Sequence, residues 1–247
     1  MPYQWLRNRV WLLLDRAGYD VRRKANVGWG ADAGRDQQQL LADAPVRVIV
    51  DAGANVGDSV AIYRSLFPDA FIHAFEPYPD VYRQLAARWA ADPHVRVHQA
   101  AVTDVTATKR FYVNKEHVTN SLLPLRKGAE SWAGAGAASA DAGLEVPTTS
   151  LDDFCARERI DRIDLLKLDI QGGEGMAIAG ASRLLSQKAV RLVYTEVLFA
   201  PLYDGQASFC DLATALDRYG YQLFGLYHLA HRPEGLGWAD AVFRPRP

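Results

Sequence analysis

The sequence predicts an α/β fold, in which a mostly parallel sheet is covered by helices on both faces. Apolar, β-branched runs alternate repeatedly with amphipathic helical segments between residues 46 and 219, and this alternation is typical of a parallel sheet. Several of these runs end in an acidic residue, and glycine turns follow two of them. The last apolar runs predict an antiparallel hairpin within residues 221–243, which closes the sheet.

Composition narrows the functional class. The chain has 247 residues and a net charge of −1, which allows one α/β domain with appendages and does not favour nucleic acid as a partner. Its two cysteines, Cys155 and Cys210, lie far apart, so the sequence predicts no zinc site or disulfide framework and fits a reducing cytoplasm. No apolar run approaches the length of a membrane span, and membrane association is not expected.

Residues 1–45 are predicted to form a helical appendage to a domain over residues 46–247. An amphipathic helix is expected over residues 3–17 because apolar side chains recur there at helical spacing. These side chains are Leu6, Val10, Leu13 and Leu14. Such a face packs on the domain or on a second subunit, as in a homodimer, and a membrane-surface role is the less favoured alternative.

The first strand and the turn after it predict a ligand site. An apolar run over residues 46–50 ends in Asp51, and Gly53 and Gly57 follow before the next helix. Ligands of such sheets bind at the carboxyl ends of the strands. We therefore expect Asp51, Gly53, Asn55 and Gly57 to contact the ligand, and the alternative is a tight turn without one.

The chemistry of this turn indicates the kind of ligand. Asn55 stands where the dinucleotide-binding pattern G-x-G-x-x-G has its middle glycine, which disfavours a nicotinamide dehydrogenase. Asp51 would repel a pyrophosphate but suits an ammonium group. Glu76 ends the next strand, 25 residues after Asp51, at the spacing that brings a carboxylate to a ribose. A ligand with an ammonium group and a ribose is S-adenosylmethionine, whose demethylated product is S-adenosylhomocysteine.

The later strands add further candidate residues. The strand predicted over residues 95–102 ends beside the expected adenine position, so Gln99 and Ala100 are candidates for the adenine pocket. An ordinary strand end is the alternative for either residue. Asp169 and Glu196 lie at or near the ends of two further predicted strands. Carboxylates at these positions indicate a functional site, because inside the sheet they would be buried and unpaired.

Three motifs together resemble the FkbM family of S-adenosylmethionine-dependent methyltransferases. They are D-A-G-A-N-V-G-D at residues 51–58, F-P-D-A-F-I-H-A-F-E-P-Y-P at residues 67–79 and L-L-K-L-D-I-Q-G-G-E at residues 165–174. The resemblance extends from about residue 46 to about residue 227. It implies a Rossmann-like class I methyltransferase fold with seven strands and a C-terminal antiparallel hairpin. It also implies O-methylation of a hydroxyl on a sugar or a secondary metabolite, hence a role in saccharide or natural-product biosynthesis.

The resemblance also suggests residues that bind cofactor or substrate. Family members carry a serine close to the cofactor in a segment after the third strand, and Asn120 and Ser121 match that segment here. We expect Ser121 to contact the cofactor and Asn120 to contact the acceptor. Tyr203 and Gln206 lie in an aromatic and polar segment after the fifth strand and are candidates for the acceptor pocket.

Transfer to a hydroxyl needs a base that takes the hydroxyl proton. The candidates are Asp169, Glu196 and His228, and Asp169 is also a candidate cofactor ligand. The same three side chains could hold a divalent metal ion that acidifies the hydroxyl, although a metal is not expected. Family members usually carry D-V-E-G where this chain has Asp169-Ile-Gln171-Gly, so one carboxylate is replaced by an amide. An N-methyltransferase of the same fold and a non-catalytic module that binds an adenosine cofactor are the alternatives.

Overall fold

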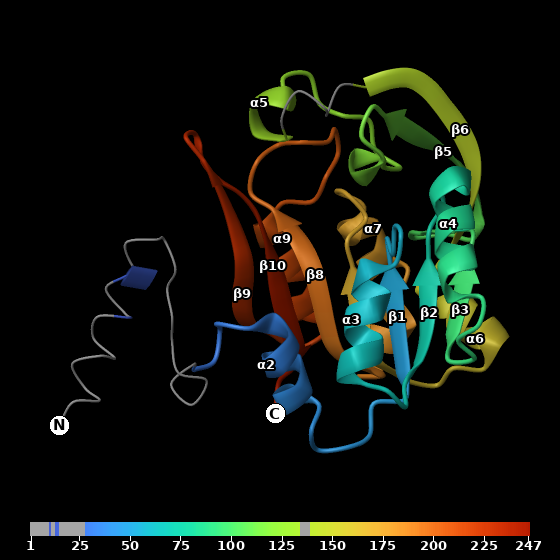
Figure 1. The fold of residues 1–247 in the computed structure, drawn as a ribbon, viewed down its shortest axis with the longest axis vertical. Helices are drawn as coiled ribbons and strands as arrows, with labels where there is room; N and C mark the ends of the chain where they lie inside the picture. The colour runs from blue at the N-terminus through green and yellow to red at the C-terminus, as the bar shows by residue number, and fades with distance from the viewer. Residues whose placement is uncertain (1–9, 11–12, 15–27, 134–138) are drawn as a thin grey trace.

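A seven-stranded sheet forms the centre of the protein (Figure 1). The computed structural model describes residues 10, 13–14, 28–133 and 139–247. From one edge to the other, the strands are β3 (Val95–His98), β2 (Phe71–Phe75), β1 (Val48–Ala52), β7 (Ile163–Leu168), β8 (Val190–Leu198), β10 (Gly235–Pro245) and β9 (Tyr221–Arg232). The first five are parallel, and β10 pairs antiparallel with β8 and β9. This order confirms the predicted Rossmann-like class I methyltransferase fold.

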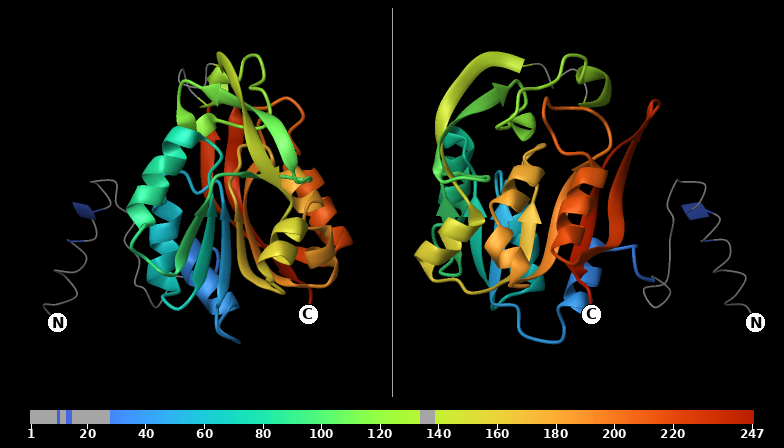
Figure 2. Two further views of the ribbon diagram at one scale, coloured as in Figure 1. Left: turned by 90° about the vertical axis from the view of Figure 1, so that its right-hand side faces the viewer. Right: turned by 180° about the vertical axis from the view of Figure 1, so that it is seen from behind.

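Helices cover both faces of the sheet (Figure 2). One face carries α2 (Ala33–Leu40), α3 (Asp58–Leu66) and α4 (Pro79–Trp89), and the other carries α6 (Leu151–Glu158), α7 (Glu174–Ala179), α8 (Ser182–Ser186) and α9 (Phe209–Arg218). Each layer is joined to the sheet by its own cluster of buried apolar side chains. All six residues of β7 are buried, because this strand lies mid-sheet and is covered on both sides.

A smaller sheet stands above the carboxyl ends of the parallel strands (Figure 1). Its strands, in order, are β4 (Ala101–Val102), β6 (Ser139–Thr149) and β5 (Ala107–Asn114). The single strand predicted over residues 95–102 is therefore two strands, because the chain leaves the main sheet after His98 and β4 pairs with β6. The 3₁₀ helix His117–Thr119 and α5 (Glu130–Ala133) lie between β5 and β6. We call residues 101–149 the cap.

The described part of the N-terminal segment packs on the sheet through α2. The Asp36 carboxylate of α2 accepts hydrogen bonds from the Tyr227 hydroxyl of β9 at 2.8 Å and from the Gly30 N–H at 2.6 Å. The Asp32 carboxylate caps the helix by accepting from the Arg35 N–H at 2.9 Å. These bonds fix α2 against the side of the sheet that α3 covers.

Most of the predicted N-terminal helix over residues 3–17 lies outside the described residues. Within that range the structure describes residues 10 and 13–14, and these are helical. The division of the chain at residue 45 stays a prediction. Within the described ranges, no helix is long and apolar enough to cross a membrane.

His228 lies inside a strand, whereas the sequence suggested the end of one. Between the pairs Tyr227–Asp240 and Ala230–Trp238, β9 contributes one residue more than β10. Such a bulge bends the strand and redirects a side chain. His228 takes φ 49° there, a left-handed backbone conformation that residues other than glycine adopt rarely.

A buried carboxylate ties the beginnings of three strands together. Asp164 of β7 is 3% exposed and accepts hydrogen bonds from the N–H groups of Arg47 and Val48 at 2.7 and 3.0 Å. Its other oxygen pairs with the guanidinium groups of Arg191 and Arg162, each at 3.1 Å. Burial alone would raise the pKa of Asp164, but these donors outweigh it and hold the pKa below its ordinary value.

Replacement of this carboxylate should therefore destabilise the fold in a pH-dependent way. Asp164→Asn leaves Arg191 in a mostly buried position without that partner charge, which should cost about 3 kcal/mol of unfolding free energy at pH 7. A lowered pKa stabilises the fold above the ordinary carboxyl value and loses that contribution as pH falls through the folded-state value. Urea unfolding should thus show a difference from wild type that shrinks below about pH 4. Asp161→Asn is the control, because Asp161 is exposed and lies shortly before β7, and its unfolding free energy should stay close to that of wild type. A destabilisation of Asp164→Asn that does not depend on pH would contradict the lowered pKa of Asp164.

Candidate functional site

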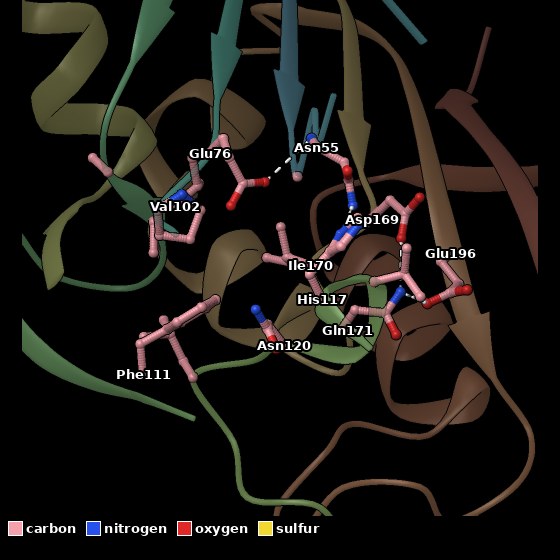
Figure 3. Close-up of a pocket in the computed structure, with 17 residues that line it drawn as sticks. Asn55, Glu76, Val102, Phe111, His117, Asn120, Asp169, Ile170, Gln171 and Glu196 are labelled. Atoms are coloured by element: carbon pink, nitrogen blue, oxygen red, sulfur yellow. Dashed lines mark hydrogen bonds between the residues drawn. The ribbon is translucent and has the colours of Figure 1, made fainter. Parts of the chain in front are cut away.

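A cavity opens at the carboxyl ends of β1, β2, β7 and β8, beneath the cap (Figure 3). Its free space, mouth included, is about 830 Å³. Its lining residues are Gly53, Asn55, Glu76, Pro77, Ala100, Ala101, Val102, Phe111, His117, Val118, Asn120, Leu122, Asp169, Ile170, Gln171, Gly173 and Glu196. Six of the residues predicted at strand ends and in the turn line this one cavity, namely Gly53, Asn55, Glu76, Ala100, Asp169 and Glu196, and their contact with a ligand stays a prediction.

Only glycine fits at position 53. Gly53 has φ +79°, and a Cβ there would lie 1.8 Å from the carbonyl oxygen of Asp169. The turn is held in place because the N–H groups of Gly53 and Ala54 both donate to the Phe75 carbonyl, at 3.1 and 2.9 Å. The close approach of the β1 and β7 turns therefore depends on the missing side chain.

Gly57 serves packing and does not line the cavity. A Cβ at Gly57 would lie 2.4 Å from Nε1 of Trp89 and 2.7 Å from Cδ1 of Leu85, both in α4. The glycine therefore lets α3 begin close against α4. Its contact with a ligand stays a prediction.

Glu76 forms one wall of the cavity (Figure 3). Its side chain is 7% exposed, and its two oxygens accept hydrogen bonds from the N–H groups of Asn55 at 3.2 Å and Tyr78 at 2.8 Å. Burial raises the pKa of Glu76 to about 7, although these two donors oppose the shift. The carboxylate is therefore fixed in orientation and can still accept from hydroxyl groups of a ligand when ionised.

Beneath the turn, a buried ion pair joins β1 to β7. Nζ of Lys167 lies 3.0 Å from Oδ1 of Asp51 and 3.5 Å from Oδ2 of Asp169, and donates to the Gly53 carbonyl at 3.3 Å. The hydroxyl of Ser59 donates to Oδ2 of Asp51 at 2.5 Å. Burial would lower the pKa of Lys167, but the two carboxylates outweigh it and raise the pKa above its ordinary value. Asp51 is fully buried, so it supports the turn from below. The sequence predicts that it contacts the ligand, but it is not among the residues that line the cavity.

Gln171 connects the two carboxylates at the other end of the cavity. Its Nε2 donates to Oδ1 of Asp169 at 3.0 Å and to Oε2 of Glu196 at 3.1 Å, while its Oε1 accepts from the Tyr203 hydroxyl at 2.9 Å. Burial and the nearby Asp169 raise the pKa of Glu196 well above its ordinary value. The Gln171 amide reduces the repulsion between the two neighbouring carboxylates because it donates to both. A glutamate, which the usual family segment has at this position, would increase that repulsion.

Asn120 points a polar group into the cavity. The residue is 8% exposed, and its Oδ1 accepts from the Asn114 N–H at 2.7 Å. Its Nδ2 is buried and has no hydrogen-bond partner among the described residues, and it faces the space near Phe111 and Ile170 (Figure 3). A buried donor without a partner is costly, so this nitrogen favours a ligand that supplies an acceptor.

Three predicted contact residues lie behind the cavity wall. The Ser121 hydroxyl donates to the Gln171 carbonyl at 2.7 Å. Tyr203 is 2% exposed and holds the Gln171 side chain. Gln206 accepts from the N–H groups of Leu202 and Tyr203 at 2.8 and 2.6 Å. Their contacts therefore shape the wall, and none of the three lines the cavity.

Two other predicted residues lie elsewhere. Gln99 is exposed and lines a shallow surface cavity beside β3, because β3 ends at His98. His228 lies beside Asp240 and Tyr194 and is not among the residues that line this cavity. The predicted metal set of Asp169, Glu196 and His228 is therefore not assembled, and the described part of the chain contains no cluster of three or more metal-binding side chains.

Most of the apolar lining residues of the cavity were not predicted from the sequence, and neither were two residues with polar side chains, Lys167 and His117. Lys167 is the only charged residue between apolar neighbours in the segment Leu165–Leu168, and a buried lysine in a strand needs a carboxylate partner. That signal could have paired it with Asp51. The ring Nδ1 of His117 in the cap lies 3.2 Å from Nδ2 of Asn55, and no local pattern indicates this contact.

Comparisons with known proteins agree with the motifs. A family model described as the methyltransferase FkbM domain matches residues 51–223. The 2-O-methyltransferase NoeI of Sinorhizobium fredii is 29% identical over 175 residues, which cover 67% of this chain and 69% of that protein. The 31-O-demethyl-FK506 methyltransferase FkbM of Streptomyces tacrolimicus is 31% identical over 156 residues, which cover 55% of this chain and 60% of that protein.

Among solved structures, precorrin-6y C5,15-methyltransferase from Geobacter metallireducens matches with 12% identity and a TM-score of 0.47, over 94% of each chain. The 1,6-didemethyltoxoflavin-N1-methyltransferase of Burkholderia thailandensis matches with 15% identity and a TM-score of 0.45, over 100% of this chain and 90% of that one.

The bridging amide gives a pH-dependent prediction. Gln171→Glu replaces a donor between Asp169 and Glu196 by a third carboxylate, so the folded state must retain protons that the unfolded state releases. Its unfolding free energy should fall as pH rises, by about 2 kcal/mol relative to wild type at pH 8 and by much less at pH 5. Urea unfolding at both pH values measures the difference. Gln39→Glu, at an exposed position of α2, is the matched control, and an equal loss at both pH values would argue against the bridge.

Proposed function

The chain belongs to the FkbM methyltransferase domain family, and we propose that it is an S-adenosylmethionine-dependent O-methyltransferase. Its acceptor is a hydroxyl of a saccharide or another natural product. Support for a hydroxyl acceptor comes from NoeI and FkbM, whose names describe a 2-O-methyltransferase and a 31-O-demethyl-FK506 methyltransferase. We also propose that the enzyme acts in the cytoplasm and forms a homodimer.

The observation that carries the cofactor assignment is Glu76. Two backbone N–H groups hold its carboxylate at the cavity wall, immediately beside the glycine turn. A carboxylate with both oxygens fixed in this way can accept from the two neighbouring hydroxyls of a ribose. This role requires the ionised form, which predominates above pH 7.

The rest of the cavity fits the other parts of the cofactor. Pro77, Ala101, Phe111 and Ile170 supply apolar walls for an adenine ring, and the free Nδ2 of Asn120 supplies a donor for a ring nitrogen. At the opposite end, the Asp169 carboxylate suits an ammonium group. When bound, the cofactor supplies a methyl group on a positively charged sulfur.

The chain's own residues provide positioning and charge for the transfer. Asp169 and Glu196, joined by Gln171, place carboxylates beside the region that a sulfonium occupies. The acceptor oxygen forms a bond to the methyl carbon as the carbon–sulfur bond breaks, and a base on the protein takes the hydroxyl proton. Asp169, Glu196 and His228 remain the candidates for that base at this stage.

Turnover distinguishes this proposal from its rivals. Wild-type protein with methyl-labelled S-adenosylmethionine should transfer label to hydroxyls of methyl glycosides or of a hydroxylated macrolide, and not to amines of matched size. Transfer to amines alone would establish the N-methyltransferase alternative. Tight cofactor binding without transfer to any member of a broad hydroxyl and amine panel would favour the non-catalytic module.

Removal of the Glu76 carboxylate should weaken binding of S-adenosylhomocysteine. Glu76→Ala loses two charge-assisted hydrogen bonds, worth about 2 kcal/mol, so the dissociation constant should rise about 30-fold in calorimetric titration. Asp80→Ala removes an exposed carboxylate in α4 and should leave the affinity unchanged. Equal affinities of wild type and Glu76→Ala would refute the ribose assignment, and no binding by folded wild type would refute the cofactor class.

The same affinity should depend on pH. Because the pKa of Glu76 is about 7 and the ionised form binds, the dissociation constant of S-adenosylhomocysteine should be about tenfold higher at pH 6 than at pH 8. The trend follows from the cost of removing a proton below the pKa. Glu76→Gln has no such proton, so its affinity should be weak and nearly flat over this range. A wild-type affinity that improves toward pH 6 would contradict the assignment.

A further inference from the structure

A second cavity lies between the sheet and the helices α2 and α3. Its free space, mouth included, is about 1130 Å³. The residues that line it are Ala31, Asp32, Ala33, Gly34, Gln37, Ser59, Ile62, Tyr63, Leu66, Lys167, Asp169, Tyr194, His228 and Asp240. The walls are thus α2, α3 and the polar faces of β7, β8, β9 and β10, and neither the glycine turn nor the cap contributes to them.

The second cavity adjoins the cofactor cavity through Asp169, which lines both. Asp240 lines the second cavity and stands directly opposite Glu196, which lines the first, in the pairing of β10 with β8. Because paired residues of antiparallel strands project to the same side of a sheet, the two cavities meet along a row of carboxylates. A molecule in the second cavity can therefore approach the end of the cofactor cavity where Asp169 lies.

A histidine and a carboxylate are paired at the edge of the second cavity, where the His228 side chain is 68% exposed and the Asp240 side chain 28%. Oδ2 of Asp240 lies 2.7 Å from Nδ1 of His228 and accepts from the Tyr194 hydroxyl at 2.6 Å. A carboxylate can only accept, so Nδ1 of the imidazole carries a proton, and in the neutral ring the lone pair is then on Nε2. His228 takes this position with a left-handed backbone at the β9 bulge. Unfavourable backbone conformations of this kind persist where surrounding structure imposes them, often at functional sites.

The polar groups of the second cavity disfavour an anion and favour a ligand that donates hydrogen bonds. Three carboxylates line it, those of Asp32, Asp169 and Asp240. Lys167, the one lysine among the described residues of the lining, is already paired with Asp51 and Asp169. An anionic ligand would meet these carboxylates without a free cation to offset them.

Gln37 adds an independent indication of a ligand. The residue is 1% exposed and lines the cavity, and its Oε1 is buried with no hydrogen-bond partner among the described residues. A buried acceptor of this kind is costly unless a donor reaches it. A hydroxyl group of a bound molecule would satisfy it.

We propose that the second cavity is the acceptor site, that it binds an uncharged polyhydroxylated molecule such as a glycosyl unit, and that His228 takes the proton of the reacting hydroxyl. The proposal rests on the methyltransferase function proposed above. The acceptor oxygen forms a bond to the methyl carbon, the carbon–sulfur bond breaks with its electron pair left on sulfur, and the hydroxyl proton moves to Nε2 of His228. Asp240 is then a positioning residue, which orients the ring and stabilises its charged form.

Two isoleucines provide a test that does not depend on activity. Ile62 lines the second cavity and Ile170 lines the cofactor cavity, so their methyl resonances report on the two sites separately, with Ile62→Val and Ile170→Val giving the assignments. Methyl glycosides are titrated onto the protein saturated with S-adenosylhomocysteine. The Ile62 resonance should shift with neutral glycosides and not with a phosphorylated hexose. Shifts confined to Ile170, no shift at Ile62, or a stronger response to the phosphorylated sugar would overturn the acceptor site.

Variants connect this binding to specific residues. Gln37→Leu should weaken glycoside binding at Ile62 at least fivefold and leave the affinity for S-adenosylhomocysteine unchanged. Gln39→Leu is the matched control, because Gln39 lies in the same helix α2 but at an exposed position. Equal glycoside affinity of wild type and Gln37→Leu would show that Gln37 does not face the ligand.

The role of His228 is tested with the glycoside that is methylated best. His228→Ala should lower kcat at least 100-fold, keep the affinity for S-adenosylhomocysteine, and regain activity on addition of imidazole. Unchanged kcat would overturn the assignment of the base. If the wild type binds no S-adenosylhomocysteine at all, and Ile170 does not respond to it, the proposed function fails; a normal cofactor response with a silent Ile62 refutes only the acceptor site.

Discussion

A single buried ammonium group holds the centre of this protein together. Lys167 projects from the middle strand of the sheet and is 8% exposed, with carboxylates of Asp51 and Asp169 on either side and the Gly53 carbonyl within reach. Without this cation the fully buried Asp51 carboxylate would have no charged partner and would lie beside the half-exposed Asp169 carboxylate, and such an arrangement is strongly unfavourable. The close approach of Gly53 to the Asp169 carbonyl is possible because residue 53 has no side chain, and the ion pair joins the two strand ends at that point. The glycine turn, and with it the position of Glu76, depends on that approach.

From this ion pair, hydrogen bonds extend upward into the cap. Asp169 bonds to Gln171, Gln171 bonds to Glu196 and Tyr203, and the Ser121 hydroxyl of the cap donates to the Gln171 backbone. The acidic end of the cofactor cavity and the cap are therefore one connected polar structure. Because the bonds of Gln171 fix both carboxylates, the side chains that face a ligand need little rearrangement when it binds, which limits the entropy lost on binding.

The sequence predicted the features that follow from strand periodicity and turn chemistry. Asp169, Glu76 and Glu196 could be placed because parallel strands end at one edge of a sheet, and Gly53 because the turn requires a left-handed backbone. Gly57 was also recognised, but its partner lies in α4, so its packing role depends on a contact between helices that one sequence does not reveal. His228 could not be placed because a bulge in β9 shifts the register by one residue. The second cavity was equally hidden, since its walls come from segments more than a hundred residues apart.

The way in which the cap joins the rest of the chain has a consequence for the diversity of the family. The cap leaves the sheet layer at β4 and returns through the end of β6, and these two segments are paired side by side, Ala101 with Thr148 and Val102 with Thr149. An insertion whose two ends are adjacent can lengthen, shorten or be exchanged with little effect on the underlying sheet, because the entropic cost of closing a loop grows only slowly with its length. The length and sequence of the cap can therefore change while the seven-stranded sheet stays the same. Because the described cap residues line the cofactor cavity and not the second cavity, such changes alter how the cofactor is enclosed and leave the proposed acceptor site in place.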